Sequence, residues 1–249
     1  MGKYNITYAS LTNMGMREVN EDYLDILDKP ERMSFILCDG LGGHGNGDVA
    51  SSFVTHEVKK WLDKGASLEV AIYRAQKALL RKQAAENAGN SMKTTIACLT
   101  ISDRAARFGH VGDSRIYRFE EGKYLYRTLD HSVPQMLVNR GEIKDSEIRH
   151  HEDRSRLIRV MGTEWDGMKY EVGDAFLING STSFLLCSDG FWELIDEKMM
   201  SKFLKESETP KQWLEKMEEV VKENGKGTNM DNYSAIAVFA RCKEGQKEK

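Results

Sequence analysis

The apolar positions of this chain fall into short runs with two different spacings. Near the N-terminus they alternate with polar residues or run without interruption, as is typical of strands; these runs cover 4–11, 23–28 and 35–38. After a glycine-rich loop the spacing becomes helical, with Asp48 as the expected N-cap of one helix and Ser67 as the N-cap of the next, which should stop at Gly89. This part of the chain predicts three strands followed by a pair of helices.

From Thr94 onward, β-forming residues dominate. Four closely spaced runs predict strands over 94–100, 106–111, 116–119 and 124–128. Because these strands follow one another too closely for helical crossovers, we expect them to pair antiparallel. The remaining patterns predict a short helix over 132–141, a strand over 184–188, helices over 196–205 and 209–224, and a closing strand over 233–240. The chain is therefore expected to be an α+β protein.

Composition narrows the class of protein. With 249 residues, of which 40% are hydrophobic and 30% charged, the chain can bury one substantial core. We expect a single domain over 1–241 and a disordered charged tail over 242–249. The net charge of −3 offers no basic field for nucleic acid or an acidic membrane, and no stretch approaches the ~18 apolar residues of a membrane span. The four cysteines lie far apart without a C-x-x-C pair, which favours reduced thiols in a cytoplasmic protein.

The apolar run 35–38 delivers a carboxylate, Asp39, to the start of the glycine-rich loop. Two interpretations of this loop compete. Gly40, Gly42 and Gly45 satisfy the G-x-G-x-x-G pattern of dinucleotide-binding proteins, in which backbone amides hold a pyrophosphate. However, two strands precede the loop, and an aspartate directly before the first glycine would repel a phosphate unless a cation lay between them. A metal site is therefore favoured, and a nucleotide-binding oxidoreductase is the weaker alternative.

Acidic residues recur beside turns, most of them at the ends of apolar runs. They are Glu21, Asp22, Asp39, Asp113, Asp189 and Asp231. If several of these carboxylates converge, they repel one another unless divalent cations neutralise them. Ligation by oxygen alone favours Mg²⁺ or Mn²⁺, and two such ions would acidify a water and hold a phosphoryl group. The planar guanidinium of Arg17 is suited to the remaining phosphate oxygens.

Eight short motifs, in this order, carry a resemblance to a known family. They are G-M-R-E-V-N-E-D from Gly15, D-G-L-G-G-H-G from Asp39, T-T at Thr94, G-D-S-R from Gly112, D-H-S from Asp130, L-I-R-V-M-G from Leu157, C-S-D-G from Cys187 and D-N-Y-S-A-I from Asp231. Together they resemble the metal-dependent (PPM, type 2C) protein serine/threonine phosphatases, most closely the stand-alone bacterial members. The resemblance spans nearly the whole chain, and eight ordered motifs are far more specific than any one of them.

The resemblance implies a four-layer α/β/β/α sandwich of two largely antiparallel sheets flanked by helix pairs. It also implies a site for two metal ions, with a third possible. The matching ligands are Asp39 bridging two ions, the main-chain carbonyl of Gly40 on one, Asp189 and Asp231 on the other, Asp22 or Glu21 holding metal-bound water, and Asp113 with Asp189 on the third ion. Arg17 matches the phosphate-binding arginine, and Glu21 and Asn232 are candidates for supporting positions beside the ligands. The region 130–160 matches a mobile flap beside the cleft.

The implied reaction is direct hydrolysis of phosphoserine or phosphothreonine by a metal-bridging hydroxide. Mn²⁺ or Mg²⁺ is the implied cofactor, the substrates are proteins phosphorylated by a serine/threonine kinase, and a monomer is expected. Some family members carry a histidine directly after the Asp-Gly pair that is proposed to protonate the leaving oxygen, whereas this chain has Leu41 there. His44 is not its equivalent, so the general acid stays unassigned. A catalytically silent binding module on the same scaffold is the alternative from another class.

Overall fold

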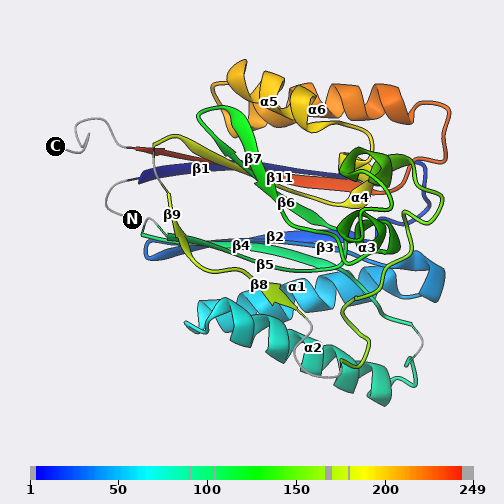
Figure 1. Ribbon diagram of the computed structural model, residues 1–249. Coiled ribbons are helices and arrows are strands. Elements are labelled where there is room, and N and C mark those ends of the chain that lie inside the picture. Colours follow the sequence, from blue (N-terminus) through cyan, green and yellow to red (C-terminus); the bar gives the residue numbers. More distant parts are fainter. Residues whose placement is uncertain (1–3, 90, 104, 166–169, 179, 243–249) are drawn as a thin grey trace.

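A computed structural model of the chain describes residues 4–89, 91–103, 105–165, 170–178 and 180–242. Figure 1 shows two sheets packed face to face, each with helices on its outer face. The β1 sheet has the order β1 (Tyr4–Asn13), β11 (Tyr233–Cys242), β10 (Thr182–Cys187), β6 (Arg115–Glu120) and β7 (Lys123–Arg127). The β2 sheet has the order β2 (Asp22–Lys29), β3 (Arg32–Asp39), β4 (Ile96–Ser102), β5 (Ala105–Val111) and β8 (Glu171–Val172), and β9 (Phe176–Leu177) also pairs with β5. These pairs are antiparallel, as expected.

The helices complete the four layers. The β2 sheet is covered by α1 (Gly47–Asp63) and α2 (Leu68–Ala85), and the β1 sheet by α5 (Glu197–Lys205) and α6 (Pro210–Gly225). The shorter helices are η1 (Gly42–His44), α3 (Val133–Asn139), η2 (Asp145–His150) and α4 (Asp189–Trp192). None of the helices in the described residues has the length and apolarity needed to cross a membrane. The expected α/β/β/α sandwich is confirmed.

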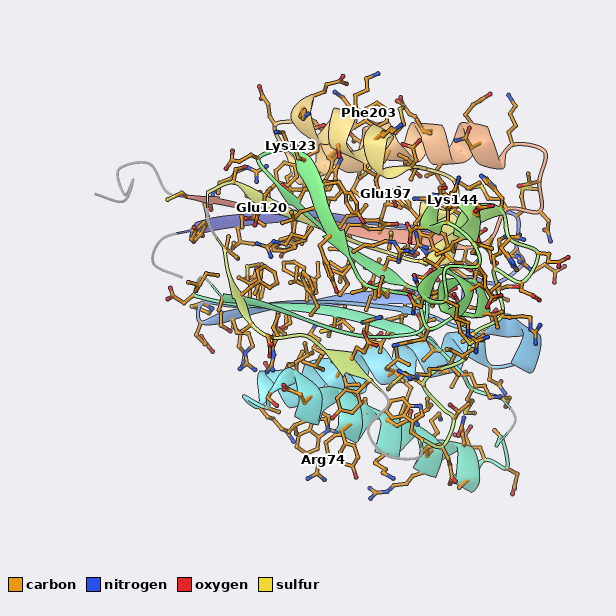
Figure 2. All side chains as sticks on the ribbon, viewed as in Figure 1. Arg74, Glu120, Lys123, Lys144, Glu197 and Phe203 are labelled. Atoms are coloured by element: carbon orange, nitrogen blue, oxygen red, sulfur yellow. The ribbon has the colours of Figure 1, made fainter. Side chains whose placement is uncertain are left out.

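The uninterrupted apolar run of β3 is explained by burial on both of its faces. Successive side chains of a strand point to opposite faces of the sheet. Phe35 and Leu37 therefore join the core between the two sheets, whereas Ile36 and Cys38 pack in the cluster formed with α1 and α2. The apolar run of β10 is divided in the same way between the inter-sheet core and the cluster under α5 and α6. Figure 2 shows the side chains that fill the space between the layers.

Several helix boundaries differ from the expected ones. The expected N-cap Asp48 is wrong, because α1 begins at Gly47 after Asn46, which has a left-handed backbone (φ 58°). Asp48 instead lies in the first turn, where a negative charge interacts favourably with the helix dipole. The expected cap Ser67 of α2 is confirmed, since its side chain accepts a hydrogen bond from the Val70 amide. This helix ends at Ala85, before Gly89.

Other differences concern short elements. Asp189 and Gly190 begin the one-turn helix α4 instead of a simple turn, and the two-residue strands β8 and β9 were not predicted. Thr94 and Thr95 lie just before β4 instead of inside it. At the C-terminus β11 continues to Cys242, one residue past the expected domain boundary. The rest of the predicted tail, 243–249, lies outside the described residues.

Strand register brings the acidic turns to one end of the sandwich. Asp22 and Asp39 are paired across β2 and β3. Because β10 runs antiparallel to β11, with Cys187 opposite Ala235, the residues after β10 meet those before β11. The loop after β1 arrives at the same place, since Asn13 pairs with Tyr233. Residues far apart in the sequence therefore meet at this end, to the right in Figure 1.

Candidate metal centre

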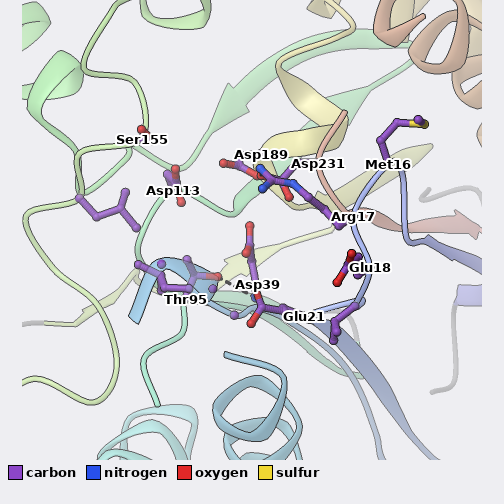
Figure 3. A pocket seen from close by; sticks show the side chains of 16 residues that line it. Met16, Arg17, Glu18, Glu21, Asp39, Thr95, Asp113, Ser155, Asp189 and Asp231 are labelled. Atoms are coloured by element: carbon purple, nitrogen blue, oxygen red, sulfur yellow. Dashed lines mark hydrogen bonds and ion pairs between the residues drawn. The ribbon is translucent and has the colours of Figure 1, made fainter. Parts of the chain in front are cut away.

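A pocket of about 690 Å³ opens where these strand ends meet. Its lining includes four aspartates, Asp39, Asp113, Asp189 and Asp231. Figure 3 shows the carboxylate of Asp39 pointing toward Asp189 and Asp231, with Asp113 to one side and Arg17 to the other. The pocket thus gathers the predicted acidic residues from both sheets, and the glycine-rich loop from Gly40 to Gly43 forms part of its wall.

The backbone of Asp39 is held by two threonines whose roles were not predicted. The amide of Asp39 donates to Thr95 Oγ1 (3.0 Å), while its carbonyl accepts from the Thr95 amide (2.8 Å) and from Thr94 Oγ1 (2.8 Å). Thr95 Oγ1 also shares a hydrogen bond of 2.7 Å with Ser114 Oγ. These contacts fix the end of β3 against the start of β4, so that the Asp39 side chain projects from a rigid strand end.

The glycine-rich loop folds closely around Glu21. A Cβ on Gly40 would lie 2.3 Å from the carbonyl oxygen of Gly47 and 2.7 Å from that of Glu21, so no larger residue fits there without a backbone shift. A Cβ on Gly42 would lie 1.9 Å from Glu21 Oε2. The glycines therefore serve close packing around a carboxylate, and the loop presents that carboxylate to the pocket.

The two acids of the predicted Glu21–Asp22 pair occupy different positions. Glu21 lines the pocket, whereas Asp22 lies beneath it and is buried. Oδ2 of Asp22 accepts a hydrogen bond from Ser188 Oγ (2.8 Å), which in turn accepts one from the Ser234 amide (2.9 Å). Oδ1 of Asp22 is buried without a hydrogen-bond partner among the described residues. The register of β2 thus directs the Glu21 side chain into the pocket and the Asp22 side chain into the protein interior.

Asn232 ties the loop after β1 to the start of β11. Its Nδ2 donates to the carbonyls of Met14 (2.8 Å) and Val19 (3.0 Å), and its Oδ1 accepts from the Glu21 amide (2.8 Å). The same loop carries Arg17, whose Nη2 donates to Asp231 Oδ2 at 2.8 Å. Both members of this ion pair are about half exposed, with side-chain accessibilities of 44% and 45%. Arg17 therefore stands at the open rim of the pocket.

Asp113 is placed by the turn after β5. Gly112 has a φ of +102°, and a Cβ there would lie 2.6 Å from Thr95 Cγ2. The carbonyl of Asp113 accepts from Trp192 Nε1 (3.0 Å). The Trp192 ring also packs under Arg115, which makes a buried two-pronged ion pair with Asp130 at 2.7 and 2.8 Å. Both partners of this pair belong to quoted motifs, G-D-S-R and D-H-S, but nothing in the sequence signalled that they pair.

Burial and mutual repulsion raise the pKa values of these acids. Desolvation is the main cause for Asp22 and Asp189, whose pKa values rise to about 7. The pKa of Asp39 lies well above its usual range, first because of burial and then because of the Asp189 charge. Asp113 is raised in the same way. Packing several acids into one desolvated pocket is costly for the charged forms.

Divalent cations fit this set of residues. The pocket offers several carboxylates within one another's electrostatic reach, and an additional buried oxygen, Oδ1 of Asp22, has no hydrogen-bond partner in the described part of the chain. Oxygen donors of this kind select hard ions such as Mg²⁺ and Mn²⁺. A cation would supply the positive charge that the pKa values indicate is lacking.

Comparison with known families decides the class of this site. The family described as protein phosphatase 2C matches residues 14–233, a range that contains all six acids. The chain belongs to the protein phosphatase 2C family. This membership confirms the family predicted from the ordered motifs and, with it, a hydrolase. The match gives no support to the dinucleotide-binding interpretation of the glycine-rich loop.

Relatives of this phosphatase family extend over most of the chain. The serine/threonine phosphatase stp of Listeria innocua is 29% identical over 213 residues, which cover 78% of this chain and 81% of the relative. The protein phosphatase PhpP of Streptococcus pneumoniae is 30% identical over 195 residues, covering 74% and 78%. Both relatives are named as phosphatases, and neither supports the catalytically silent alternative.

Solved structures of phosphatases share the architecture. A bacterial serine phosphatase superposes with a TM-score of 0.84 and 26% identity, covering 98% of this chain and 100% of the other. The catalytic domain of the serine/threonine protein phosphatase PstP, solved in complex with two manganese ions, superposes with a TM-score of 0.80 and 23% identity, covering 96% and 99%. The four-layer fold is therefore that of bacterial members of this family.

Proposed function

We propose that this chain removes phosphate from phosphoserine and phosphothreonine in proteins, using Mn²⁺ or Mg²⁺ held in the pocket. The observation that carries the proposal is the convergence of Asp39, Asp189 and Asp231, from both sheets, beside the guanidinium of Arg17. The substrate class is supported by the names of two relatives, the serine/threonine phosphatase stp and the protein phosphatase PhpP. The two manganese ions of PstP support the kind of metal.

We assign the ligands as the resemblance to this family implies, and use the lining of the pocket to choose between Glu21 and Asp22. Asp39 would bridge two ions, the main-chain carbonyl of Gly40 would join one of them, and Asp189 and Asp231 would hold the other. Asp113 and Asp189 would hold a third ion. For the remaining acid we favour Glu21 over Asp22, because Glu21 lines the pocket while Asp22 is buried beneath it and bonded to Ser188. Asp22 would then support the site from below, together with Asn232 from the side.

The residues of the pocket favour water as the nucleophile. When bound, two divalent cations acidify a water between them and neutralise charge on the phosphoryl group. Among the described residues that line the pocket, the hydroxyl side chains are Thr95 and Ser155. Thr95 is occupied by Asp39 and Ser114. Ser155 has no hydrogen bond to a histidine among the described residues, although His150 lines the adjoining cavity with it. Direct hydrolysis without a phosphoenzyme is therefore the proposed route.

Arg17 and Leu41 determine how the phosphate is bound and whether a side chain protonates the leaving oxygen. The planar guanidinium of Arg17 is suited to bind two non-bridging phosphate oxygens, and its half-exposed position lets it exchange Asp231 for substrate. Leu41 lines the pocket next to Gly40 and has no proton to give, so the general acid stays unassigned. Protonation of the serine or threonine leaving oxygen must then come from another source, with water as one candidate.

The setting of the enzyme is part of the proposal. Its substrates would be proteins phosphorylated by a serine/threonine kinase. Cys38, Cys98 and Cys187 are free and buried, which supports a reducing cytoplasmic setting. A monomer is part of the same proposal, since the assigned ligands of one chain form the pocket without a partner's residue.

Replacement of Asp39 tests the assignment. The Asp39→Asn variant should lose Mn²⁺-dependent release of p-nitrophenol from p-nitrophenyl phosphate by about 10²–10³-fold or more. It should remain folded, because the substitution removes a charge whose burial is unfavourable. The matched control is Asp63→Asn, at the exposed end of α1, which should keep wild-type activity. Full activity of Asp39→Asn would defeat the assignment, and an inactive wild-type protein in Mn²⁺ would favour the silent binding module.

A further inference from the structure

A cluster of two histidines and a glutamate lies outside the pocket. His110 comes from β5, His131 follows Asp130 at the start of the predicted flap, and Glu171 belongs to β8. Their potential ligand atoms all lie within 4.8 Å of one another, and both histidines are buried. Two histidines and a carboxylate at these distances could bind a metal ion. Whether they do depends on which nitrogen of each ring carries a proton.

Hydrogen bonds assign the tautomers of both rings. The amide of Gly112 donates to His131 Nδ1 (3.0 Å), so this nitrogen bears a lone pair and the proton of the neutral ring is on Nε2. That Nε2 lies 3.4 Å from Glu171 Oε1. Nε2 of His110 faces the carbonyl of Leu129 at 2.8 Å and must therefore carry a proton. Burial lowers the pKa of His110 to about 4, which keeps its ring neutral.

This arrangement does not suit a metal ion. An ion on His131 Nε2 would move the proton to Nδ1, where it would point at the N–H of Gly112. The two rings are also stacked, with centroids 4.7 Å apart and planes within 3° of parallel. The lone pairs of stacked rings lie in separate planes and do not converge between them. The cluster is therefore better suited to hydrogen bonding than to ligation.

His131 joins the Asp113 turn to both ends of the flap. It exchanges two hydrogen bonds with Gly112, since its own amide also donates to the Gly112 carbonyl (2.9 Å). Its carbonyl accepts from the Ile158 amide (2.8 Å), and the neighbouring Ser132 forms a bridge with Leu157. Leu157 lines the pocket, as does Asp113. One residue thus links a candidate metal ligand to the segment that closes the pocket on that side.

We propose that His131 is a positioning residue whose Nδ1 fixes the Gly112–Asp113 turn relative to the flap. The His110 ring stacks on its imidazole, and the Glu171 carboxylate lies 3.4 Å from its Nε2 without a hydrogen bond of good geometry. The proposal rests on the proposed function, because Asp113 matters here as a ligand of a metal ion. Its distinctive claim is that the acceptor at Nδ1, and not the bulk of the ring, sets how well the pocket binds metal.

Three substitutions separate the acceptor from the bulk of the ring. Asn places its side-chain oxygen the same number of bonds from Cα as Nδ1, Gln places it one bond further, and Leu has no acceptor. We expect His131→Leu and His131→Gln to weaken the last Mn²⁺ to bind by about fivefold or more, as for the loss of one hydrogen bond, and His131→Asn to restore it. Calorimetric Mn²⁺ titration measures the Mn²⁺ affinity without turnover. The control is His56→Asn, at an exposed position of α1.

A second measurement reads the tautomer directly. Long-range ¹H–¹⁵N correlation at pH 8 should show His131 protonated at Nε2 and unprotonated at Nδ1. A proton on Nδ1, Zn²⁺ binding that is lost in His131→Asn, or equal Mn²⁺ affinities in wild type, Leu and Asn variants would each overturn the proposal. Failure of the proposed function gives a different result, namely no phosphate release by the wild-type protein at saturating Mn²⁺.

Discussion

Burial of acids in the pocket has a cost that depends on pH. Asp22 and Asp189 have pKa values near 7 in the folded chain, mainly because of desolvation, and Asp39 is also raised. In the unfolded chain the same groups titrate near pH 4. Between these values the folded state binds more protons than the unfolded state. The free energy of unfolding must therefore fall as the pH rises through this range, since its slope follows the difference in bound protons.

This sign gives a prediction for the metal-free protein. In EDTA, the contribution of the pocket acids to the free energy of unfolding should be fully present near pH 4 and be lost by pH 8, at ~1.4 kcal/mol for each pKa unit of a shifted group. Urea unfolding of wild type and Asp189→Asn at pH 5, 6.5 and 8 measures it. The variant should lose less stability than wild type over that range. A steeper loss in the variant would contradict the prediction.

At the scale of elements, Asn232 in the turn before β11 makes most of the side-chain hydrogen bonds that join this turn to the loop after β1. Asn232 makes three hydrogen bonds to backbone groups of this loop and is only 6% exposed. The loop carries both Arg17 and Glu21, which face the pocket. Loss of these bonds would leave buried backbone groups without partners, and such groups are costly.

Replacing Asn232 should therefore affect stability and catalysis together. Asn232→Leu is expected to lower the free energy of unfolding by about 2–3 kcal/mol, from buried groups left without partners. It should also raise KM for p-nitrophenyl phosphate, because Arg17 loses its fixed position. Asn232→Asp keeps the acceptor for the Glu21 amide and should fall between Leu and wild type. Unfolding in urea and steady-state kinetics give both quantities; wild-type KM and stability in the Leu variant would rule out this role.

Periodicity predicted the elements whose faces are defined by the core. Strands β3 and β10 were visible because both of their faces are buried, and α2 because Ser67 is a standard cap. Elements of two to four residues, such as β8, β9 and α4, contain too few positions for a period to be recognised. The start of α1 was missed because it depends on the left-handed Asn46, which no pattern of apolar residues signals.

The site followed the same division. Repeated acids beside turns predicted the acidic residues that line the pocket apart from Glu18, and also Asp22, which does not line it. The choice between Glu21 and Asp22 required the register of β2, because neighbouring side chains point to opposite faces. Contacts that join distant segments, such as Arg115 with Asp130, Thr95 with Asp39 and His131 with Gly112, exist only once the chain is folded. A single sequence contains no local signal for them.

At the scale of the whole molecule, the pocket lies across the junction of the two sheets. Asp39 ends a strand of the β2 sheet, Asp189 and Asp231 adjoin strands of the β1 sheet, and Asp113 lies in the turn that connects β5 of one sheet to β6 of the other. A cation shared by acids from both groups would link the sheets directly. Metal binding should therefore stabilise the whole fold and not only the loops around the pocket.

We expect Mn²⁺ to raise the melting temperature and EDTA to lower it. At a metal concentration about 100-fold above Kd, the gain in the free energy of unfolding is about 2.7 kcal/mol per site. Differential scanning calorimetry measures the shift, and Asp39→Asn should lose most of it. NAD is the negative control, since the acidic residues that line the pocket beside the glycine-rich loop would repel a pyrophosphate. A shift with NAD but not with Mn²⁺ would contradict the metal assignment.

The first and last described strands end side by side, since Tyr4 pairs with Cys242. This end of the two strands lies opposite the end where Asn13 pairs with Tyr233, which adjoins the acidic residues (Figure 1). A group attached beyond either strand would lie at the end of the molecule remote from the pocket. Such a group could be a solid support, a fluorescent label or a second folded unit. The mouth of the pocket then faces outward, so a tethered copy can still accept a large folded phosphoprotein.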